Sequence, residues 1–378
     1  MKVIVVGAGV VGTLHAWHAV ERGHEVVHIE RETEARGASL RNFGQIWVSG
    51  RAGGEELDTA LRARELWERI GARVPGIGFR AIGSLTLVRN PLEQAVAETA
   101  LSRVDAADRG YALLTAAEAR GINPALRGDF AAALWCERDA AVEPRVALLA
   151  LRRALLATGR YAFLPGREVR EVIEARGAGS AGVRDDHGDT HRGDVVVLCT
   201  GAWLGGLVRE LAGELPVRRV RLQMMQTDPL GEPLTTSVAD ADSFRYYPAY
   251  ASPALDAMNA GQAQDPVAAE HRTQLLMVQR LDGGLTIGDT HAYEHPFAFD
   301  TLEDPYEHLT RVVGSFLGRP LPAIRRRWAG VYAQCADTRR VVYRRQVRDG
   351  VWLVTGPGGR GMTCSPAIAE TTADELGW

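Results

Sequence analysis

The sequence predicts an α/β fold, in which a doubly wound parallel sheet carries an inserted α+β domain built on an antiparallel sheet. Two apolar runs, at 3–6 and 194–198, each continue into a glycine-bearing turn. Such unbroken runs are typical of strands that are buried on both faces, as in the centre of a parallel sheet. Strand-like segments with Pro and Gly turns between 217 and 328 indicate the antiparallel sheet.

Residues 1–31 follow the order strand, glycine turn, helix, strand and acid. The strand precedes three glycines at the spacing G-x-G-x-x-G: Gly7, Gly9 and Gly12. The first permits a tight turn, the second lets a pyrophosphate approach the backbone, and the third lets the helix at 13–22 pack closely. The helix start attracts phosphates, and Glu30 can accept hydrogen bonds from ribose hydroxyls. We predict a dinucleotide site for NAD or FAD, with a glycine turn that binds no ligand as the alternative.

The composition predicts a cytoplasmic protein with small-molecule partners. The 378 residues are 46% hydrophobic and 24% charged, which is ordinary for a globular chain. A net charge of −3 predicts no nucleic-acid or membrane surface, and no apolar run suggests a membrane span. We expect no signal peptide, because a core strand begins at residue 3. The cysteines lack metal-ligand spacing and are predicted to be reduced thiols: Cys136, Cys199, Cys335 and Cys364.

The segment 31–54 has neither helical nor strand periodicity. Long irregular segments beside a nucleotide site are often functional, and this one offers groups suited to a pyrophosphate and a ring system: Ser39, Arg41, Asn42 and Gly44. A solvated surface loop is the alternative. The pattern then predicts a helix over 55–70, a strand within 78–89, helices over 91–111 and 115–121, a mixed segment at 129–143, and a helix from Pro144 to about Ala157.

A second set of nucleotide-binding features follows the first helices. A strand centred on 169–173 and a polar hairpin over 177–194 lead to the buried strand 194–198. That strand runs into Cys199-Thr200-Gly201-Ala202-Trp203, which brings N–H groups to the carboxyl edge of the sheet, where ligands of open α/β sheets bind. A β-meander inserted into such a sheet is typical of large flavin folds.

Strand patterns predominate between 217 and 328. Alternation at 275–287 predicts an antiparallel sheet with one covered face, and a helix is expected over 303–316. We interpret the region as a substrate domain. Its candidate lining residues, each of which taken singly is more often structural, are Arg245, Tyr246, Tyr247, Tyr250 and His291.

The C-terminal region returns to the nucleotide domain. A strand over 351–354 precedes the turn T-G-P-G-G-R-G-M-T at 355–363, and Pro366 is expected to begin a helix that ends near Leu376. A glycine-rich turn that feeds a helix creates a second anion-binding helix start, here with Arg360. A glycine-rich capping loop without a ligand is the alternative.

Five segments together resemble the D-amino-acid oxidase superfamily of FAD oxidoreductases, in the branch with glycine oxidase and sarcosine oxidase. They are G-A-G-V-V-G with Glu30, G-A-S-L-R-N-F-G at 37–44, C-T-G-A-W at 199–203, W-A-G-V-Y at 328–332 and G-P-G-G-R-G-M-T-C-S-P at 356–366. The resemblance implies FAD in place of NAD, and a Rossmann-like FAD domain of glutathione-reductase type. Its expected parts are 1–80, 140–215 and 335–378, with a substrate domain at 81–139 and 216–334.

The resemblance also implies the residues that hold FAD without a covalent bond. In that family the first motif and the acid bind the adenosine half, the 39–42 loop lies along the pyrophosphate and ring, and the last loop meets the pyrimidine side of the isoalloxazine. The residues are Gly7, Gly9, Val10, Val11, Gly12, Glu30, Arg31, Ala38, Ser39, Arg41, Asn42, Gly44, Gln45, Val169, Cys199, Thr200, Gly201, Trp203, Gly356, Gly358, Gly359, Arg360, Gly361, Met362 and Thr363.

One departure from the family pattern bears on the substrate. Glycine and D-amino-acid oxidases carry a carboxylate-binding Arg in W-A-G-[LIV]-R-P, where this chain has Tyr332. Without that fork a carboxylate loses its bidentate anchor. Shorter strings, R-N-F-G-Q-I-W at 41–47, G-D-T-H at 288–291 and G-V-Y-A at 330–333, are similar to a bacterial clade associated with phosphonate catabolism. That likeness implies an aminoalkylphosphonate. A phosphonate needs several donors, and the basic groups near the expected pocket segments are Arg41, Arg51, Arg245 and Arg360, of which the first three are the anion-binding candidates.

The predicted activity is that of an FAD-dependent amine oxidase. Hydride passes from the α-carbon of a primary or N-methyl amine to flavin N5, the imine hydrolyses to an aldehyde, and O2 reoxidises the flavin to give H2O2. The candidate catalytic residues are Arg360, Tyr332, His291, Tyr246 and Tyr247, with Arg360 stabilising reduced flavin. The alternatives are an oxidase of glycine, sarcosine or D-amino acids, a dehydrogenase with another acceptor, an NAD dehydrogenase, and an FAD-binding module without catalysis.

Overall fold

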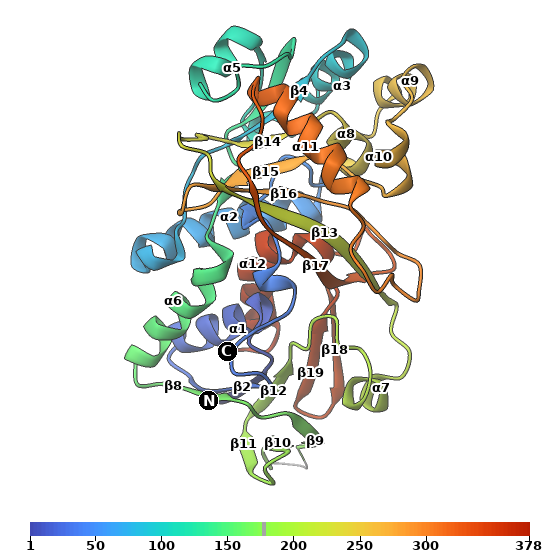
Figure 1. Cartoon of the computed structure of the whole chain (residues 1–378). Helices are drawn as coiled ribbons and strands as arrows, with labels where there is room; N and C mark the ends of the chain where they lie inside the picture. Colours follow the sequence, from blue (N-terminus) through green and yellow to red (C-terminus); the bar gives the residue numbers. More distant parts are fainter. Residues whose placement is uncertain (176–178) are drawn as a thin grey trace.

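The computed structural model describes residues 1–175 and 179–378. Within them, two large sheets lie one above the other, with helices between them and around the upper one (Figure 1). The lower sheet consists, in spatial order, of β18 (Tyr343–Arg348), β19 (Val351–Thr355), β12 (Val195–Leu198), β1 (Lys2–Val6), β2 (Glu25–Glu30) and β8 (Tyr161–Pro165). Its neighbouring strands are parallel except β18 and β19, which are antiparallel.

The apolar strands of the lower sheet are central because both of its faces are covered. Val3 and Val5 of β1 pack in the cluster on the helical face, whereas Ile4 and Val196 pack in the cluster on the other face. One face of the lower sheet is covered by the helices α1 (Val10–Glu21), α2 (Glu55–Arg73), α6 (Pro144–Ala157) and α12 (Gly361–Glu375). The other face is covered by α7 (Leu207–Ala212) and by a three-stranded meander of β9 (Val169–Ile173), β10 (Ala181–Asp185) and β11 (Thr190–Gly193). The prediction of buried parallel strands is confirmed.

The meander confirms the strand predicted at 169–173 and the polar hairpin that follows it. Of that hairpin, 177 and 178 lie outside the described residues. The prediction missed β8, which is a separate strand and pairs in parallel with β2 at the edge of the lower sheet.

The upper sheet is largely antiparallel, and only β14 and β4 run parallel among its neighbouring described strands. In spatial order its strands are β17 (Ile324–Cys335), β13 (Val217–Pro229), β16 (Gly284–Gly288), β15 (Leu276–Gln279), β14 (Ser237–Ala239), β4 (Ser84–Val88), β6 (Ala132–Cys136) and β5 (Tyr111–Thr115). The predicted α/β class with a second, antiparallel sheet is confirmed.

Both faces of the upper sheet are covered, so the expectation of one covered face is wrong. Leu276 and Val278 pack in one cluster, while Leu275 and Met277 pack in another, with α11 (Asp304–Leu317). The alternating pattern alone does not show whether the second face of the sheet is solvated or covered by apolar residues. In these strands too few polar residues alternate with the apolar ones to indicate a solvated face.

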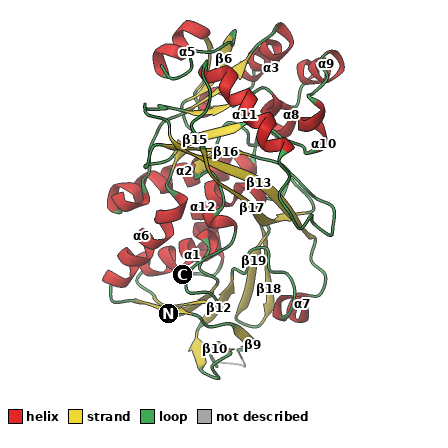
Figure 2. Cartoon of the chain, in the orientation of Figure 1, coloured by secondary structure: helices red, strands yellow, loops and turns green. Residues whose placement is uncertain are grey.

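Helices interrupt the region predicted to be mostly strands. Between β14 and β15 the chain forms α8 (Asp242–Tyr246), a 3₁₀ turn at Pro248–Tyr250, α9 (Pro253–Gly261) and α10 (Pro266–Glu270), visible at the upper right of Figure 2. The single helix expected over 91–111 is also wrong. It divides into α3 (Pro91–Leu101) and α4 (Ala106–Arg109), after which Gly110, at φ +63°, turns the chain into β5. The helix that follows is α5 (Ala116–Ile122).

The last helix begins at Gly361, five residues before the predicted start at Pro366. Proline inside a helix lacks the N–H that would bond the carbonyl four residues earlier, here Met362. The buried indole of Trp67 on α2 donates to that carbonyl at 2.9 Å and replaces the missing bond. The helix therefore continues through Pro366 because a neighbouring helix supplies a donor.

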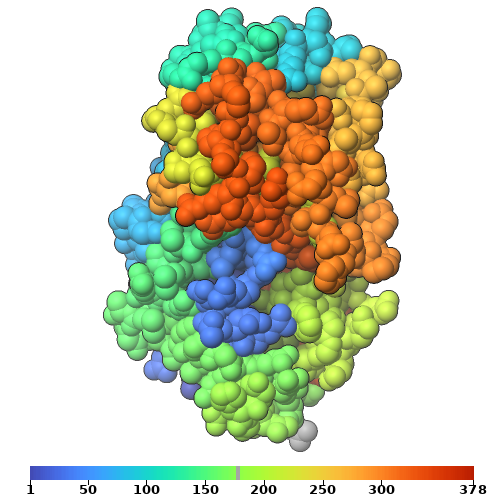
Figure 3. Space-filling view, viewed as in Figure 1, coloured from blue at the N-terminus to red at the C-terminus, as the bar shows by residue number. Residues whose placement is uncertain are grey.

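Segments distant in sequence meet around the space between the sheets. In Figure 3 the N-terminal part, in blue, lies at the surface between the green and the orange parts of the chain. A short pair, β3 (Gln45–Ile46) and β7 (Ala140–Ala141), ties the irregular segment to the start of α6. The predicted domain boundaries stay a prediction, although the lower-sheet strands all fall within the segments assigned to the FAD domain. None of the described helices is long and apolar enough to cross a membrane.

Candidate active site

The glycine turn after β1 is shaped by close approaches within the chain. Gly7 has φ +99°, and a Cβ there would lie 2.4 Å from the Cys199 carbonyl oxygen; a Cβ on Gly12 would lie 1.9 Å from the Gly7 oxygen. Gly9 differs, because within the described part of the chain a Cβ there would meet a single atom, Ser39 Oγ at 3.1 Å. Gly9 therefore opens onto free space, where a ligand backbone can approach.

That free space is one cavity of about 1480 Å³, which runs from the glycine turn to the upper sheet. Pockets for a single small ligand are about 300–1,000 Å³, so this cavity has room for a large cofactor and a substrate. Glu30 and Arg360, from opposite ends of the chain, both line it, as do all the predicted catalytic and anion-binding residues.

Four of the predicted cofactor residues do not line the cavity: Gly12, Gly44, Gly356 and Thr363. The glycines are packing positions, since a Cβ on Gly44 would lie 2.2 Å from Val142 O and one on Gly356 would lie 3.1 Å from Cys335 Sγ. Thr363 Oγ1 accepts a hydrogen bond from Trp47 N at 2.9 Å. These residues shape the cavity wall from behind.

The cavity end beside β2 carries the predicted acid. Glu30 is buried, and its carboxylate accepts hydrogen bonds from Ala8 N at 2.7 Å and Glu32 N at 3.1 Å. At the mouth the Arg31 guanidinium lies 4.4 Å from the centroid of the exposed Trp203 ring. Val169, the first residue of β9, also lines this end.

The 38–47 segment is held by its own side chains. Asn42 Nδ2 donates to the carbonyls of Ala38 and Ser39, both at 2.9 Å, and its Oδ1 accepts from Gly44 N at 2.7 Å. Asn42 therefore forms the loop, while its amide is not free for a ligand. Ser39 Oγ accepts from Val10 N at 2.9 Å and so couples the loop to the start of α1.

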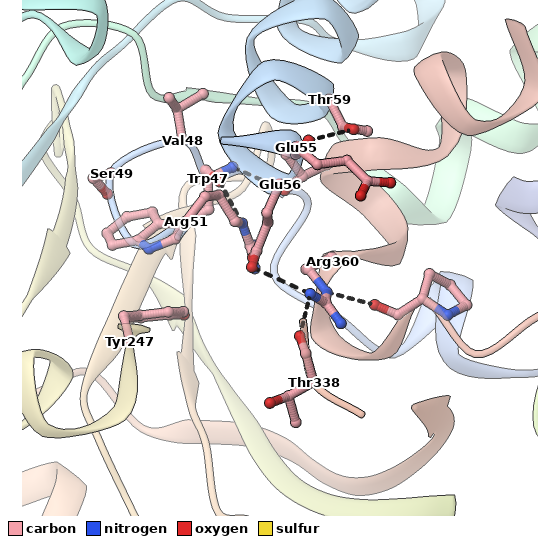
Figure 4. Close-up of polar contacts among 12 residues, drawn as sticks. Trp47, Val48, Ser49, Arg51, Glu55, Glu56, Thr59, Tyr247, Thr338 and Arg360 are labelled. Atoms are coloured by element: carbon pink, nitrogen blue, oxygen red, sulfur yellow. Dashed lines mark hydrogen bonds and ion pairs between the residues drawn. The ribbon is translucent and has the colours of Figure 1, made fainter. Parts of the chain in front are cut away.

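A buried Arg–Glu–Arg network forms the wall nearest α2 (Figure 4). Glu56 Oε1 lies 3.6 Å from Arg51 Nη1, and Glu56 Oε2 lies 3.2 Å from Arg360 Nη1. Arg51 Nε donates to Trp47 O at 2.8 Å, and its guanidinium lies 5.9 Å from the Tyr247 ring centroid. Burial alone would lower the pKa of Arg51, but Glu56 and other nearby groups outweigh it and raise that pKa. Arg51 is therefore a permanent cation in the wall.

Arg360 already has acceptors for each guanidinium nitrogen. These are the carbonyl oxygens of Pro357 at 3.2 Å, Thr338 at 2.9 Å and Arg340 at 2.8 Å. Through these carbonyls and Glu56, Arg360 connects the glycine loop to residues 338–340 and to α2. Its predicted effect on the flavin stays a prediction, and that effect would act through its charge.

Two buried residues behind the wall fix the segment that carries Arg51. Asp139 accepts from Val48 N at 2.5 Å and Ser49 N at 3.0 Å, and Arg109 donates to the carbonyls of Val48 at 3.0 Å, Ser49 at 2.9 Å and Arg51 at 2.7 Å. Donors and acceptors of the loop are thus both satisfied. The sequence analysis missed this support, because Asp139 and Arg109 lie in segments without a recognised motif.

The upper end of the cavity is an aromatic wall. The rings of Tyr246 and His291 stack with centroids 4.2 Å apart, and Tyr247 lies edge-on to Tyr246 at 5.0 Å. Tyr332 on β17 is buried, and its hydroxyl has no hydrogen-bond partner in the described structure. Burial raises the pKa of both Tyr246 and Tyr332, so their hydroxyls are neutral donors.

Two polar residues of this wall were missed by the sequence analysis. Asp289 and Gln274 line the cavity, and Asp289 Oδ1 and Gln274 Oε1 are buried without a partner among the described residues. Asp289 belongs to the string G-D-T-H at 288–291, of which the sequence analysis names only His291 as a site residue. An acid directly after an apolar strand was the signal that could have found it.

The predicted anion-binding arginines separate in the structure. Arg245 bonds Asp242 Oδ1 at 3.0 Å and Gln262 O at 2.8 Å, and it also contacts Asn259. Its guanidinium holds α8 against α9, and its predicted contact with a substrate anion stays a prediction. Arg41 is exposed and donates to Ala329 O at 2.8 Å. Arg51 is buried, and its guanidinium lies 5.9 Å from the Tyr247 ring centroid in the aromatic wall.

The model of one protein family, FAD dependent oxidoreductase, matches residues 2–375. The chain belongs to this family. Glycine oxidase from Pseudomonas aeruginosa is 27% identical over 393 residues, which cover 99% of this chain and 94% of that protein. The fold matches glycine oxidase from Geobacillus kaustophilus, with a TM-score of 0.78, 19% identity and coverage of 99% and 94%. It also matches L-α-glycerophosphate oxidase from Mycoplasma pneumoniae with FAD bound, with a TM-score of 0.75, 19% identity and coverage of 100% and 94%.

The residues of the cavity fit FAD. Gly9 leaves room where a Cβ would protrude, and Thr200 Oγ1, Gln45 Nε2 and Trp47 Nε1 are buried polar atoms of the wall without partners in the described residues. Buried polar groups are normally hydrogen-bonded, so unpartnered ones along a long cavity indicate a polar ligand. The predicted FAD cofactor and the predicted oxidoreductase class are confirmed. The four cysteines are buried, and Cys335 does not line the cavity.

Proposed function

We propose that the chain is an FAD-dependent amine oxidase whose substrate is an aminoalkylphosphonate, such as 2-aminoethylphosphonate or its N-methyl form. The observation that carries the proposal is Tyr332. Its neutral hydroxyl, rather than a guanidinium, is the polar group of β17 at the aromatic wall. A planar carboxylate would find no bidentate fork there, whereas a tetrahedral anion accepts single bonds from several directions.

Arg51 supplies the positive charge for the substrate anion in this proposal. It is buried, stays charged and lies beside Tyr247. Glu56 does not cancel its positive charge, because the one carboxylate is paired with both Arg51 and Arg360. The hydroxyls of Tyr332, Tyr246 and Tyr247 can donate to the remaining anion oxygens. A cation held in a dry wall attracts an anion more strongly than a solvated one does.

The chain contributes mainly positioning to the reaction. FAD supplies the acceptor for the hydride of the carbon next to the amine nitrogen. The stacked pair Tyr246 and His291 limits the positions that the amine can take, and the aromatic wall excludes water from it. The imine product hydrolyses to an aldehyde and an amine or ammonia, and O2 is the proposed final acceptor, which gives H2O2.

A second candidate is oxidation of an α-amino acid, favoured by the likeness to glycine oxidase over nearly the whole chain. Anaerobic mixing of the FAD-loaded protein with aminophosphonates, glycine, sarcosine and D-amino acids tests both. We expect the visible flavin band to bleach fastest with an aminophosphonate. Bleaching by glycine or sarcosine at least as fast would overturn the proposed substrate class, and subsequent mixing with O2 would show whether peroxide forms.

A further inference from the structure

Asp289 places a carboxylate in the aromatic wall, and no arginine or lysine of the described residues forms an ion pair with it. Its side chain is 10% exposed, and its backbone is fixed to Gln274, since Asp289 N donates to Gln274 O at 3.0 Å. Asp289 Oδ1 has no hydrogen-bond partner in the described chain, although the residue lines the cavity. Buried carboxylates are normally paired, so one left open toward a cavity indicates a cationic ligand.

The groups that face this carboxylate are a histidine, an amide and phenols, the amide being the side chain of Gln274. From its own segment His291 approaches, with Nε2 3.8 Å from Asp289 Oδ2; the neighbouring titratable groups are phenols, Tyr246 and Tyr247 beside α8, Tyr293, and Tyr332 on β17. His291 Nδ1 lies 3.0 Å from the Arg272 carbonyl and donates to it, so in the neutral ring Nε2 carries the lone pair. Burial raises the pKa of the Asp289 carboxyl.

The wall thus has two ends of opposite charge. Both are near Tyr247: the Arg51 guanidinium lies 5.9 Å from its ring centroid, and burial, together with the charge of Asp289, raises the pKa of its phenol. An aminoalkyl acid is a cation at its nitrogen and an anion at its other end, and it matches this polarity. The Arg51 end suits the anion, so the Asp289 end suits the nitrogen.

We propose that Asp289 binds the ammonium group of the substrate and accepts one of its protons. This inference rests on the proposed function, because it assigns the amine end of the same site. One N–H bond of the ammonium breaks, its electron pair stays on nitrogen as the lone pair, and the proton forms an O–H bond on Asp289 Oδ1. The product of this step is the neutral amine, which hydride transfer requires.

Binding without turnover tests the ammonium contact. The ligand is (2-amino-2-methylpropyl)phosphonate, which has no hydrogen on the carbon next to nitrogen, and its comparison is 2-methylpropylphosphonate, which lacks the amine. Affinity for the FAD-loaded protein is measured by calorimetry and by perturbation of the flavin spectrum. We expect Asp289→Asn to weaken binding of the amine at least about tenfold and to change binding of the amine-free ligand less than about twofold.

Two variants separate this contact from a general effect on folding. Asp240→Asn removes another buried carboxylate of the upper sheet, whose Oδ1 accepts from Leu275 N at 3.1 Å but which does not line the cavity. We expect it to leave both affinities unchanged, and Asp289→Glu to restore part of the amine affinity. Equal loss for both ligands in Asp289→Asn would overturn the inference.

The pH profile tests the proton transfer and remains informative if Asp289→Asn fails to fold. In the wild type, amine affinity should fall as pH drops through the raised pKa of Asp289, while affinity for the amine-free ligand should not follow that pKa. Wild-type protein that binds both ligands equally at every pH would overturn the inference. If no amine bleaches the flavin while amine binding still depends on Asp289, the oxidase proposal is rejected and the Asp289 contact stands.

Discussion

Replacement of Glu56 by Gln tests whether one carboxylate stabilises both buried arginines of the cavity wall. Arg51, Glu56 and Arg360 carry +1, −1 and +1, a net charge of +1, and Glu56→Gln raises it to +2 with nearly the same shape. The three side chains are 7%, 5% and 7% exposed, so water screens their repulsion weakly. Loss of one partner from a buried ion pair costs about 3–5 kcal/mol. We expect a loss of this size, most of it from Arg360, whose contact with Glu56 is the shorter.

Urea unfolding of the FAD-loaded protein, followed by circular dichroism, measures this loss. The matched control is Glu65→Gln on the same helix, where Glu65 is 62% exposed and lies 3.0 Å from Arg62; it should cost less than about 1 kcal/mol. The double variant with Arg51→Gln returns the net charge to +1 and should recover part of the stability. A loss for Glu56→Gln no larger than that of the control would refute the reasoning.

Three further predictions concern the fold around the cofactor. Gly12→Ala should abolish FAD binding, because its Cβ would lie 1.9 Å from Gly7 O. Gly9→Ala should fold normally and bind FAD more weakly. Melting curves measure the folding of both variants, and FAD titration measures their binding. Trp67→Phe removes the donor to Met362 O and should cost at least about 1–3 kcal/mol in urea unfolding; an unchanged midpoint would contradict this. Burial lowers the pKa of His28 from 6.5 to about 4. Between these two pH values the His28 side chain binds a proton in the unfolded chain but not in the folded one. The free energy of unfolding should therefore fall as the pH drops, by up to about 1.4 kcal/mol per pH unit from this residue. His28→Phe should flatten that slope, and an unchanged slope in denaturation at several pH values would contradict the assignment.

The parts of the fold predicted from sequence are those that local chemistry determines. The run Val3 to Val6 needs cover on both faces, and the structure supplies it. Gly12 packs against the carbonyl oxygen of Gly7, which leaves no room for a side chain, and this contact lies within one turn of the chain. Such features depend little on distant residues, so the pattern alone identifies them.

The errors arise where a distant residue decides the outcome. Pro366 is expected to begin a helix, yet the helix passes through it because Trp67, about 300 positions away in the chain, donates to Met362. Arg245 is expected to bind the substrate anion, which stays a prediction, and in the structure its guanidinium also contacts Asp242, Asn259 and Gln262. The composition of a segment does not reveal which acceptors fold against it, so the assignment of surplus arginines to a site needs the structure.

The same reasoning explains why Asp289 escaped attention while His291 did not. Histidine attracts interest as a titrating group, but in this wall His291 is oriented by the Arg272 carbonyl and presents one nitrogen to the carboxylate. An acid directly after the apolar strand β16 must either find a cation within the fold or face a cavity that brings one. Asp289 lines the cavity, its Oδ1 is buried without a partner among the described residues, and its backbone is bonded to Gln274. The burial that raises its pKa therefore also makes it a suitable acceptor for the proton of an ammonium group.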